Sequence, residues 1–288
     1  MIKDPFNYIG NKTKLLPQIE QNLDFNSKFL VDVFAGSGVV SANFSGRFQK
    51  TIVNDRLTQL VEIQKHLYKT PINRILKDID SWISLFDLGK LNKEEFIECR
   101  KYYNNSQKDD PMLLLTLIYN SFNYMLMFNS KGEFNVPHGY ARSSFNSSLR
   151  DKLTKYTQKI QTVNLEFTNY CFTELIEVME AGEVNWSEYI FYLDPPYFNS
   201  SDSYSRTKAI TWTEKLEREL YETLDLLNAN GSKFLLSNVV ENNGNTNEIL
   251  KEWMKSYNVV EINLDYKGCN YQRKNNGKTR EVMVKNYV

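Results

Sequence analysis

Short apolar runs alternate with helical patterns along most of this chain, and that alternation limits the folds open to it. Five runs have the length of buried strands, and two more candidates lie near the end of the sequence. These seven runs cover residues 29–34, 51–53, 163–167, 189–193, 233–236, 259–264 and 280–287. Helical patterns follow several of them, at residues 39–48, 57–68, 172–181 and 213–227. The alternation predicts an α/β fold with a mostly parallel sheet covered on both faces.

Residues 70–160 interrupt this rhythm. They carry helical patterns at 71–88, 93–103 and 112–119, followed by a stretch rich in Gly, Asn and Ser. Within that stretch, residues 129–132 separate two extended segments and predict a hairpin turn. We therefore expect one domain from residues 1–69 and 161–288, with a mainly helical subdomain of residues 70–160 inserted between two strands.

Composition excludes several classes of protein. A length of 288 residues with 41% apolar residues suits a globular chain, and no apolar run is long enough to span a membrane. The first residues lack the apolar stretch of a signal peptide, so we expect a cytoplasmic protein. Cys99, Cys171 and Cys269 lie far apart without a C-x-x-C pair, and there are only two histidines. These counts argue against a metal site and against a Ser-His-Asp hydrolase.

The first motif that indicates chemistry is the run from Asp32 to Gly38, in which a buried strand leads into a glycine-containing turn and a helix. Glycine allows the backbone to approach a ligand closely. Alone, the pattern is shared by nucleotide binders, dehydrogenases and methyltransferases. It is not a P-loop, because no Gly-Lys-Ser/Thr follows.

The second motif is Asn54-Asp55, at the end of the second predicted strand. An acidic residue at that place commonly accepts hydrogen bonds from the two ribose hydroxyls of an adenosine-containing ligand. The alternative is a cap for the helix that begins near Arg56, and this motif alone favours neither.

The third motif, Asp194-Pro195-Pro196-Tyr197, follows an apolar strand. Two successive prolines stiffen the backbone, so the Asp194 carboxylate and the Pro195 carbonyl are positioned to accept the two hydrogens of an exocyclic amine. Tyr197 is suited to stack on the base that carries the amine. Methylating an amine conjugated to a ring requires such acceptors, because they turn the nitrogen lone pair toward the methyl donor.

The whole chain resembles the Dam-type (D12 class) adenine-specific DNA N6-methyltransferases. Besides these three motifs, the resemblance is carried by Tyr8-Ile9-Gly10-Asn11-Lys12 and by the run Lys131-Gly132-Glu133-Phe134-Asn135-Val136-Pro137. It implies a Rossmann-like fold with a seven-stranded sheet and S-adenosylmethionine as methyl donor, which leaves as S-adenosylhomocysteine. It also implies double-stranded DNA as the partner and extrusion of the target adenine from the duplex.

The resemblance also assigns roles to residues. Those implied for catalysis are Asp194, Pro195, Pro196 and Tyr197. Those implied for cofactor binding are Tyr8, Gly10, Lys12, Asp32, Phe34, Ala35, Gly36, Ser37, Gly38, Asp55, Cys171, Phe172 and Asp194. Those expected to contact DNA are Tyr124, Met127, Asn129, Lys131, Asn135, Pro137, His138, Arg142, Arg273 and Lys274. Tyr124 and Phe145 are candidates for insertion into the duplex, although packing inside the protein is the favoured interpretation of each.

Two positions depart from the family pattern. Residues 168–172 fall where most relatives carry an Asp in the turn that binds the cofactor adenine, so backbone amides and Phe172 take a larger part here. Met127 falls where relatives that read GATC carry an arginine for guanine, a contact worth about 1–3 kcal/mol. Either another residue such as Arg142 reads that base, or the recognition sequence differs from GATC, which we favour.

Other functions remain open at this point. The same chemistry serves methyltransferases that act on RNA bases, and a non-catalytic DNA-binding regulator could keep the fold. Cytosine-N4 methylation is usually linked to a Ser-Pro-Pro-Tyr form of the motif. Such an enzyme either belongs to a restriction-modification system, with a separate restriction endonuclease as its functional partner, or is a solitary DNA methylase. We expect a monomer or a weak dimer with no membrane association.

Overall fold

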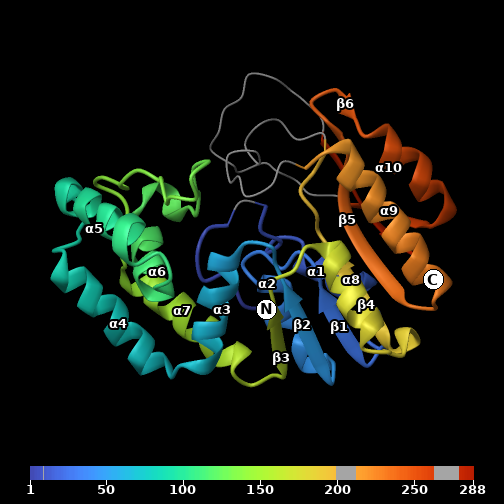
Figure 1. The fold of residues 1–288 in the computed structure, drawn as a ribbon, viewed down its shortest axis with the longest axis horizontal. Helices are drawn as coiled ribbons and strands as arrows, with labels where there is room; N and C mark the ends of the chain where they lie inside the picture. The colour runs from blue at the N-terminus through green and yellow to red at the C-terminus, as the bar shows by residue number, and fades with distance from the viewer. Residues whose placement is uncertain (9, 199–211, 263–278) are drawn as a thin grey trace.

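A twisted central sheet organises the protein (Figure 1). The computed structural model describes residues 1–8, 10–198, 212–262 and 279–288. Seven strands follow the order β3-β2-β1-β4-β5-β8-β7, and the short β6 pairs with β5 beside this path. The first five strands in that order are parallel, whereas β8 runs antiparallel to both of its neighbours. The strands are β1 (Phe29–Asp32), β2 (Lys50–Asn54), β3 (Leu165–Thr168), β4 (Tyr189–Leu193), β5 (Lys233–Asn242), β6 (Asn245–Thr246), β7 (Asn258–Ile262) and β8 (Thr279–Lys285). The predicted mostly parallel seven-stranded sheet is confirmed.

Alternate side chains of the central strands enter two different cores. In β4, Ile190 and Tyr192 pack in one apolar cluster, while Phe191 and Leu193 pack in the other. Helices cover both faces, as predicted: α1 (Leu16–Asn22) and α2 (Val39–Phe44) on the first, and α8 (Phe172–Ala181), α9 (Glu214–Ala229) and α10 (Glu248–Trp253) on the second. Burial on both faces explains why these strands are continuous apolar runs in the sequence.

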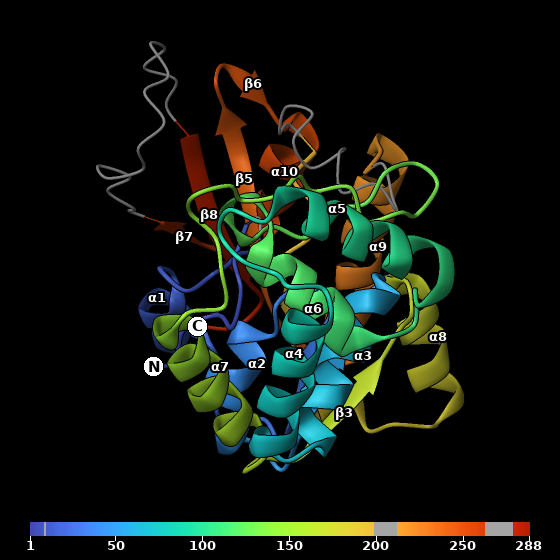
Figure 2. The ribbon, with the colours of Figure 1, turned by 90° about the vertical axis from the view of Figure 1, so that its left-hand side faces the viewer.

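The segment between β2 and β3 is mainly helical, as predicted, and lies beside the β3 edge of the sheet (Figure 2). Its helices are α3 (Thr58–Lys69), α4 (Ile72–Leu85), α5 (Lys93–Ser106), α6 (Pro111–Asn120) and α7 (Ser147–Ile160). Every residue of α6 after Pro111 is buried, because α3, α4 and α5 all contact it. One continuous apolar cluster contains residues of β2, β3 and α3 together with residues of α4 to α7, so these helices pack against the edge of the sheet.

Helix α7 was not among the predicted elements. The Asn146 side chain accepts a hydrogen bond from the Leu149 backbone N–H (3.1 Å) and caps its start. Its buried residues include Leu149, Leu153 and Ile160, spaced for one face of a helix. Three lysines and Arg150 lie between the apolar positions, so the segment looks like a basic stretch in the sequence.

The predicted hairpin turn at residues 129–132 is confirmed. The Asn129 N–H donates to the Glu133 carbonyl (2.9 Å), and Phe128 and Phe134 form an antiparallel bridge. Gly132 has a φ of +70°, the left-handed conformation that such turns favour. Among the described residues, no helix has both the length and the apolar character that crossing a membrane requires.

Candidate active site

The glycine turn after β1 is held in place by side chains from three other elements. Asp55 Oδ2 accepts a hydrogen bond from the Gly36 N–H (2.8 Å), and Gln64 Nε2 donates to the Gly36 carbonyl (2.6 Å). From α7, the Tyr156 hydroxyl donates to the Ser37 carbonyl (2.9 Å). Gly36 and Gly38 both have positive φ, a backbone conformation that glycine adopts readily. The three hydrogen bonds hold the turn in this conformation.

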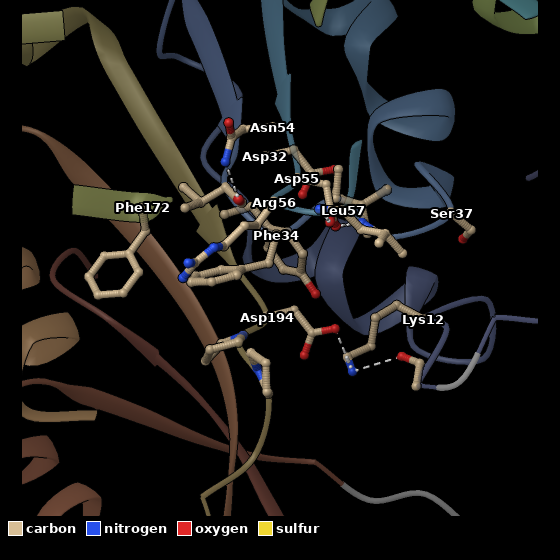
Figure 3. Close-up of a pocket in the computed structure, with 18 of the residues that line it drawn as sticks. Lys12, Asp32, Phe34, Ser37, Asn54, Asp55, Arg56, Leu57, Phe172 and Asp194 are labelled. Atoms are coloured by element: carbon tan, nitrogen blue, oxygen red, sulfur yellow. Dashed lines mark hydrogen bonds and ion pairs between the residues drawn. The ribbon is translucent and has the colours of Figure 1, made fainter. Parts of the chain in front are cut away.

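Two polar side chains of this motif, those of Ser37 and Asp32, form hydrogen bonds with neighbouring side chains of the protein. The Ser37 hydroxyl donates to Asp4, and in Figure 3 its side chain lies away from Asp194. Asp32 is 1% exposed and accepts a hydrogen bond from the Ser41 hydroxyl (2.6 Å). Burial raises the pKa of Asp32 to about 7, since a charged carboxylate loses its hydration there.

Asp55 lies between the glycine turn and α3. Besides the bond to Gly36, its Oδ1 accepts a hydrogen bond from the Leu57 N–H (2.8 Å), and burial raises its pKa. Helix α3 begins at Thr58 with Leu57 as its capping residue, so Asp55 is not the cap itself. Asp55 lines the same cavity as the glycine turn. A position in that cavity is needed if Asp55 is to bind the ribose of a ligand, as predicted.

Asn54 joins three segments of this region through four hydrogen bonds. Its Nδ2 donates to the carbonyls of Val33 (2.9 Å) and Tyr170 (3.0 Å). Its Oδ1 accepts from the Thr168 hydroxyl (2.9 Å) and from the Tyr170 N–H (3.0 Å). The 1% exposed amide therefore uses all of its donors and holds the ends of β1 and β3 in register.

Replacing Asn54 with Asp is expected to lower the free energy of unfolding by about 3 kcal/mol, because two buried carbonyls lose their donor and face a carboxylate instead. Chemical denaturation with urea measures the change. Asn73→Asp, on the exposed side of α4, is the matched control and is expected to change stability by less than about 0.5 kcal/mol. Equal effects of the two substitutions would contradict the role given to Asn54.

Cys171 and Phe172 lie at the start of α8, Cys171 as its N-cap and Phe172 as its first residue. Cys171 caps the helix, with its Sγ accepting from the Glu174 N–H (3.4 Å) while Glu174 Oε2 accepts from the Cys171 N–H (2.9 Å). The Phe172 ring lies 5.9 Å from the Phe34 ring, measured between centroids. Both residues line the cavity, as the sequence predicted for an adenine-binding turn.

Asp194 is at the centre of a charged cluster below the glycine turn. Lys12 Nζ lies 2.8 Å from Asp194 Oδ2 and donates to the Tyr197 hydroxyl (2.7 Å) and the Gly10 carbonyl (3.2 Å). The Tyr197 hydroxyl lies 3.2 Å from Asp194 Oδ1 and 3.1 Å from Glu281 Oε1. Figure 3 shows the Lys12 and Asp194 side chains pointing toward each other, with the ion pair drawn as a dashed line. Burial raises the pKa of Asp194 to about 6, although the Lys12 ammonium opposes that shift.

One cavity of about 360 Å³ brings most of the predicted site together. The predicted residues that line it are Tyr8, Gly10, Lys12, Asp32, Phe34, Ala35, Gly36, Ser37, Asp55, Cys171, Phe172, Asp194, Pro195, Pro196 and Tyr197. Gly38 lies just behind it, at the start of α2. The cavity opens at the carboxyl ends of β1, β2 and β4, where open α/β sheets bind their ligands.

A family model described as D12 class N6 adenine-specific DNA methyltransferase matches residues 8–267, which is most of the 288-residue chain. The chain belongs to this family. The match includes the glycine turn, the Asp194–Tyr197 motif and the entire insert.

Several curated proteins resemble this D12 class chain along its length. Modification methylase StsI of Streptococcus sanguinis is 35% identical over 99% of this chain, and type II methyltransferase M.FokI of Planomicrobium okeanokoites is 34% identical over 100% of it. The chain spans 43% of the length of each of these two proteins. The DNA adenine methylase of Escherichia coli K12 is 27% identical over 74% of this chain and 72% of its own length.

The D12 insert exposes several of the residues predicted to contact DNA. Along the extended segment after the turn, Asn135 and Pro137 point outward while Phe134 and Val136 are buried. Lys131 and Arg142 are also exposed. Tyr124 and Met127 are half-buried against the apolar cluster of the insert.

Other residues predicted to contact DNA are buried, are bonded within the protein or lie outside the described residues. His138 is 9% exposed, with its Nε2 3.0 Å from the Gly89 carbonyl, so its burial argues against a phosphate contact. Asn129 uses its side chain to hold the hairpin turn, accepting from the Lys131 and Glu133 N–H groups. Phe145 is buried against Tyr119, with ring centroids 4.7 Å apart, which is not the position of a residue that inserts into DNA. Arg273 and Lys274 lie outside the described residues.

Several residues that line the cavity were missing from the predicted site, among them Asn54, Arg56 and Trp212. Glu281, which contacts the Tyr197 hydroxyl, was missing as well. Asn54 belongs to the Asn54-Asp55 motif, but only Asp55 was assigned a role. Trp212 and Glu281 lie in no recognised motif, and their proximity to Phe34 and Tyr197 depends on how α9 and β8 pack. An isolated aromatic or acidic residue carries no such signal in a single sequence.

Proposed function

We propose that this chain transfers a methyl group from S-adenosylmethionine to the N6 amine of adenine in double-stranded DNA. The observation that carries the proposal is that Asp194, Pro195 and Tyr197 line the same cavity as the glycine turn. A site for an exocyclic amine is thereby adjacent to a site for a nucleoside-containing methyl donor. Family membership supports the reaction class.

The charges around the cavity suit this cofactor. Asp55 and Asp194 both raise the pKa of Asp32, which means that their negative potentials overlap. A ligand with a positive charge relieves that repulsion, and aromatic residues such as Phe34 and Phe172 offer surfaces for its adenine. When bound, S-adenosylmethionine supplies an electrophilic methyl group on a positively charged sulfur. Asp55 holds the ribose, and the glycine turn holds the methionine part with Tyr8 and Lys12 beside it.

The residues of the Asp194–Tyr197 motif orient the target amine. Asp194 and the Pro195 carbonyl accept its two hydrogens, while Pro196 keeps the backbone stiff and Tyr197 stacks on the base. In the structure the Asp194 carboxylate is already paired with the Lys12 ammonium, with Lys12 Nζ 2.8 Å from Asp194 Oδ2. The incoming amine must share or replace that contact, so Lys12 holds the carboxylate in place until the base arrives.

Residues 70–160 are proposed as the target-recognition subdomain, inserted into a catalytic domain of residues 1–69 and 161–288. Exposed Lys131, Asn135, Pro137 and Arg142 contact the duplex, with Tyr124, Met127, Arg273 and Lys274 completing the interface. Extruding the adenine requires a few kcal/mol of lost stacking and pairing. Since Met127 cannot form the bidentate contact of an arginine with guanine, we propose a recognition sequence other than GATC.

The relatives StsI and M.FokI are longer than this chain, which spans 43% of each of them. The activity that we propose for the chain is therefore not carried over from the activity of those complete proteins. The names of those relatives support a modification enzyme paired with a separate restriction endonuclease. We place it in the cytoplasm, acting as a monomer or a weak dimer.

Transfer of tritium from labelled S-adenosylmethionine to unmethylated genomic DNA tests the function, followed by sequencing that detects modified bases. N6-methyladenine within one short motif is expected, and the motif identifies the recognition sequence. Label on RNA instead of DNA would replace the proposed substrate, and bound cofactor without any transfer would favour a regulator.

Acid is expected to inhibit the reaction with an apparent pKa near 6 in kcat/KM, because the pKa of Asp194 is raised to about 6 and protonation removes the negative charge that makes its carboxylate a strong acceptor for the amine. Activity is therefore retained above that pH and falls about tenfold per unit below it. Single-turnover rates between pH 4.5 and 8 measure the profile, with circular dichroism confirming that the protein stays folded. A rate that stays constant down to pH 4.5 would contradict this role of Asp194.

A further inference from the structure

Three aromatic rings form the apolar end of the cavity. Phe34 lies 5.9 Å from Phe172, and the Trp212 indole lies 5.8 Å from Phe34 and 5.9 Å from Phe172, all measured between ring centroids. Phe34 lies two residues after β1 and Phe172 is the first residue of α8, so regular elements fix both positions. Trp212 precedes α9 and belongs to neither a strand nor a helix, so something else must hold its ring.

A buried carboxylate holds it. Glu217 on α9 is fully buried, and its Oε2 accepts a hydrogen bond from the Trp212 indole N–H (2.5 Å). Its Oε1 accepts from Asn238 Nδ2 (3.3 Å), from Asn247 Nδ2 (2.6 Å) and from the Tyr221 hydroxyl. All four neighbours donate, so this place suits a side chain that only accepts hydrogen bonds.

The same neighbours tie Glu217 to the surrounding structure. Asn238 belongs to β5, and Asn247 caps α10 by accepting from the Leu250 N–H (3.0 Å). The Tyr221 ring stacks on Trp253 with centroids 4.5 Å apart. Removing a carboxylate from water is unfavourable unless its bonds are satisfied, and an apolar residue would fill the space without that penalty. A role at the cavity explains why the carboxylate is there.

We propose that Glu217 is a positioning residue that fixes the plane of Trp212 as a wall for the adenine of the cofactor. The inference rests on the proposed function for the identity of the ligand. A flat purine gains most from rings already held in their bound orientation, because no side-chain freedom is then lost on binding. Glu217 does not line the cavity itself and acts only through the indole.

Glu217→Gln tests this tether with a side chain of the same shape. Its amide oxygen faces the three donors at the Oε1 position, which leaves its NH₂ group opposed to the indole N–H. Binding of S-adenosylhomocysteine, measured by calorimetry, is expected to weaken about tenfold, as for one lost hydrogen bond to a charged group. Trp212→Phe keeps an aromatic ring but lacks the N–H, and a loss of similar size is expected.

The double variant separates this role from a general loss of stability. If Glu217 acts through Trp212, Glu217→Gln adds no further loss of affinity to the Trp212→Phe protein. Independent, multiplying losses would overturn the proposal, as would an unchanged affinity of either single variant. Should Glu217→Gln fail to fold, Trp212→Phe decides alone, since wild-type affinity in that variant refutes the tether.

The protein offers a matched control. Trp253 Nε1 donates to Asp225 Oδ1 (2.8 Å) on the outer side of α9, outside the cavity. Asp225→Ala removes the same kind of indole bond, whereas Asn would keep an accepting oxygen there, and Asp225→Ala is expected to leave the affinity unchanged. A wild-type protein that does not bind S-adenosylhomocysteine would refute the proposed function instead. The tether is then read from acrylamide quenching of tryptophan fluorescence, which Glu217→Gln should increase and which, if unchanged, overturns the tether too.

Discussion

Substituting Asp194 with alanine is expected to lower the rate of methyl transfer by on the order of 10³-fold, the effect of removing a positioned group at a reacting centre. The amine of the target base loses the carboxylate that accepts its hydrogen, so its lone pair stays conjugated with the ring. Single-turnover transfer of tritiated methyl groups to DNA measures the loss.

Cofactor binding is the control for this experiment. S-adenosylhomocysteine has no charge on sulfur, so its affinity should change only a few-fold when one carboxylate is removed. Lys12 keeps hydrogen bonds to Gly10 and Tyr197 in the variant, and the fold should therefore persist. Transfer at the wild-type rate by a folded Asp194→Ala protein would refute the mechanism.

Replacing Gly38 with alanine is expected to destabilise the protein by about 3 kcal/mol or more and to abolish detectable cofactor binding. Its φ is +75°, and a Cβ there would lie 2.6 Å from the Tyr156 hydroxyl and 2.7 Å from Gln64 Oε1. Those two side chains hold the glycine turn, so moving them breaks their bonds to Ser37 and Gly36. Urea denaturation and calorimetry measure the two effects.

Gly244→Ala is the matched control for backbone strain. Gly244 has a φ of +83°, but a Cβ there would meet no atom within 4 Å. Its substitution should therefore cause only the left-handed conformational penalty, about 1–2 kcal/mol, and leave cofactor binding intact. If Gly38→Ala were no worse than Gly244→Ala, the close packing around the turn would not matter.

The sheet was predictable because its pattern is local. Strands buried on both faces are short apolar runs, and β4 and α8 occur at the residues that were predicted. Helix α7 was missed because the basic residues between its apolar positions obscure the apolar face in the sequence. Strand β5 extends to Asn242, beyond its predicted end, because β8 pairs along its length. That pairing depends on a distant segment.

The residue types that indicate the chemistry are readable in short runs of the sequence: a glycine turn, an acid after β2 and the Asp194–Tyr197 motif. The partners of these residues depend on the tertiary structure. Lys12 and Tyr197 are 185 residues apart in the chain yet bonded at 2.7 Å, and Asn238 and Asn247 meet Glu217 from different elements. Such contacts depend on how whole helices and strands pack, which a local pattern does not encode. For the same reason, His138, close in sequence to the hairpin turn at residues 129–132, was predicted to contact DNA, whereas the fold buries it against Phe96.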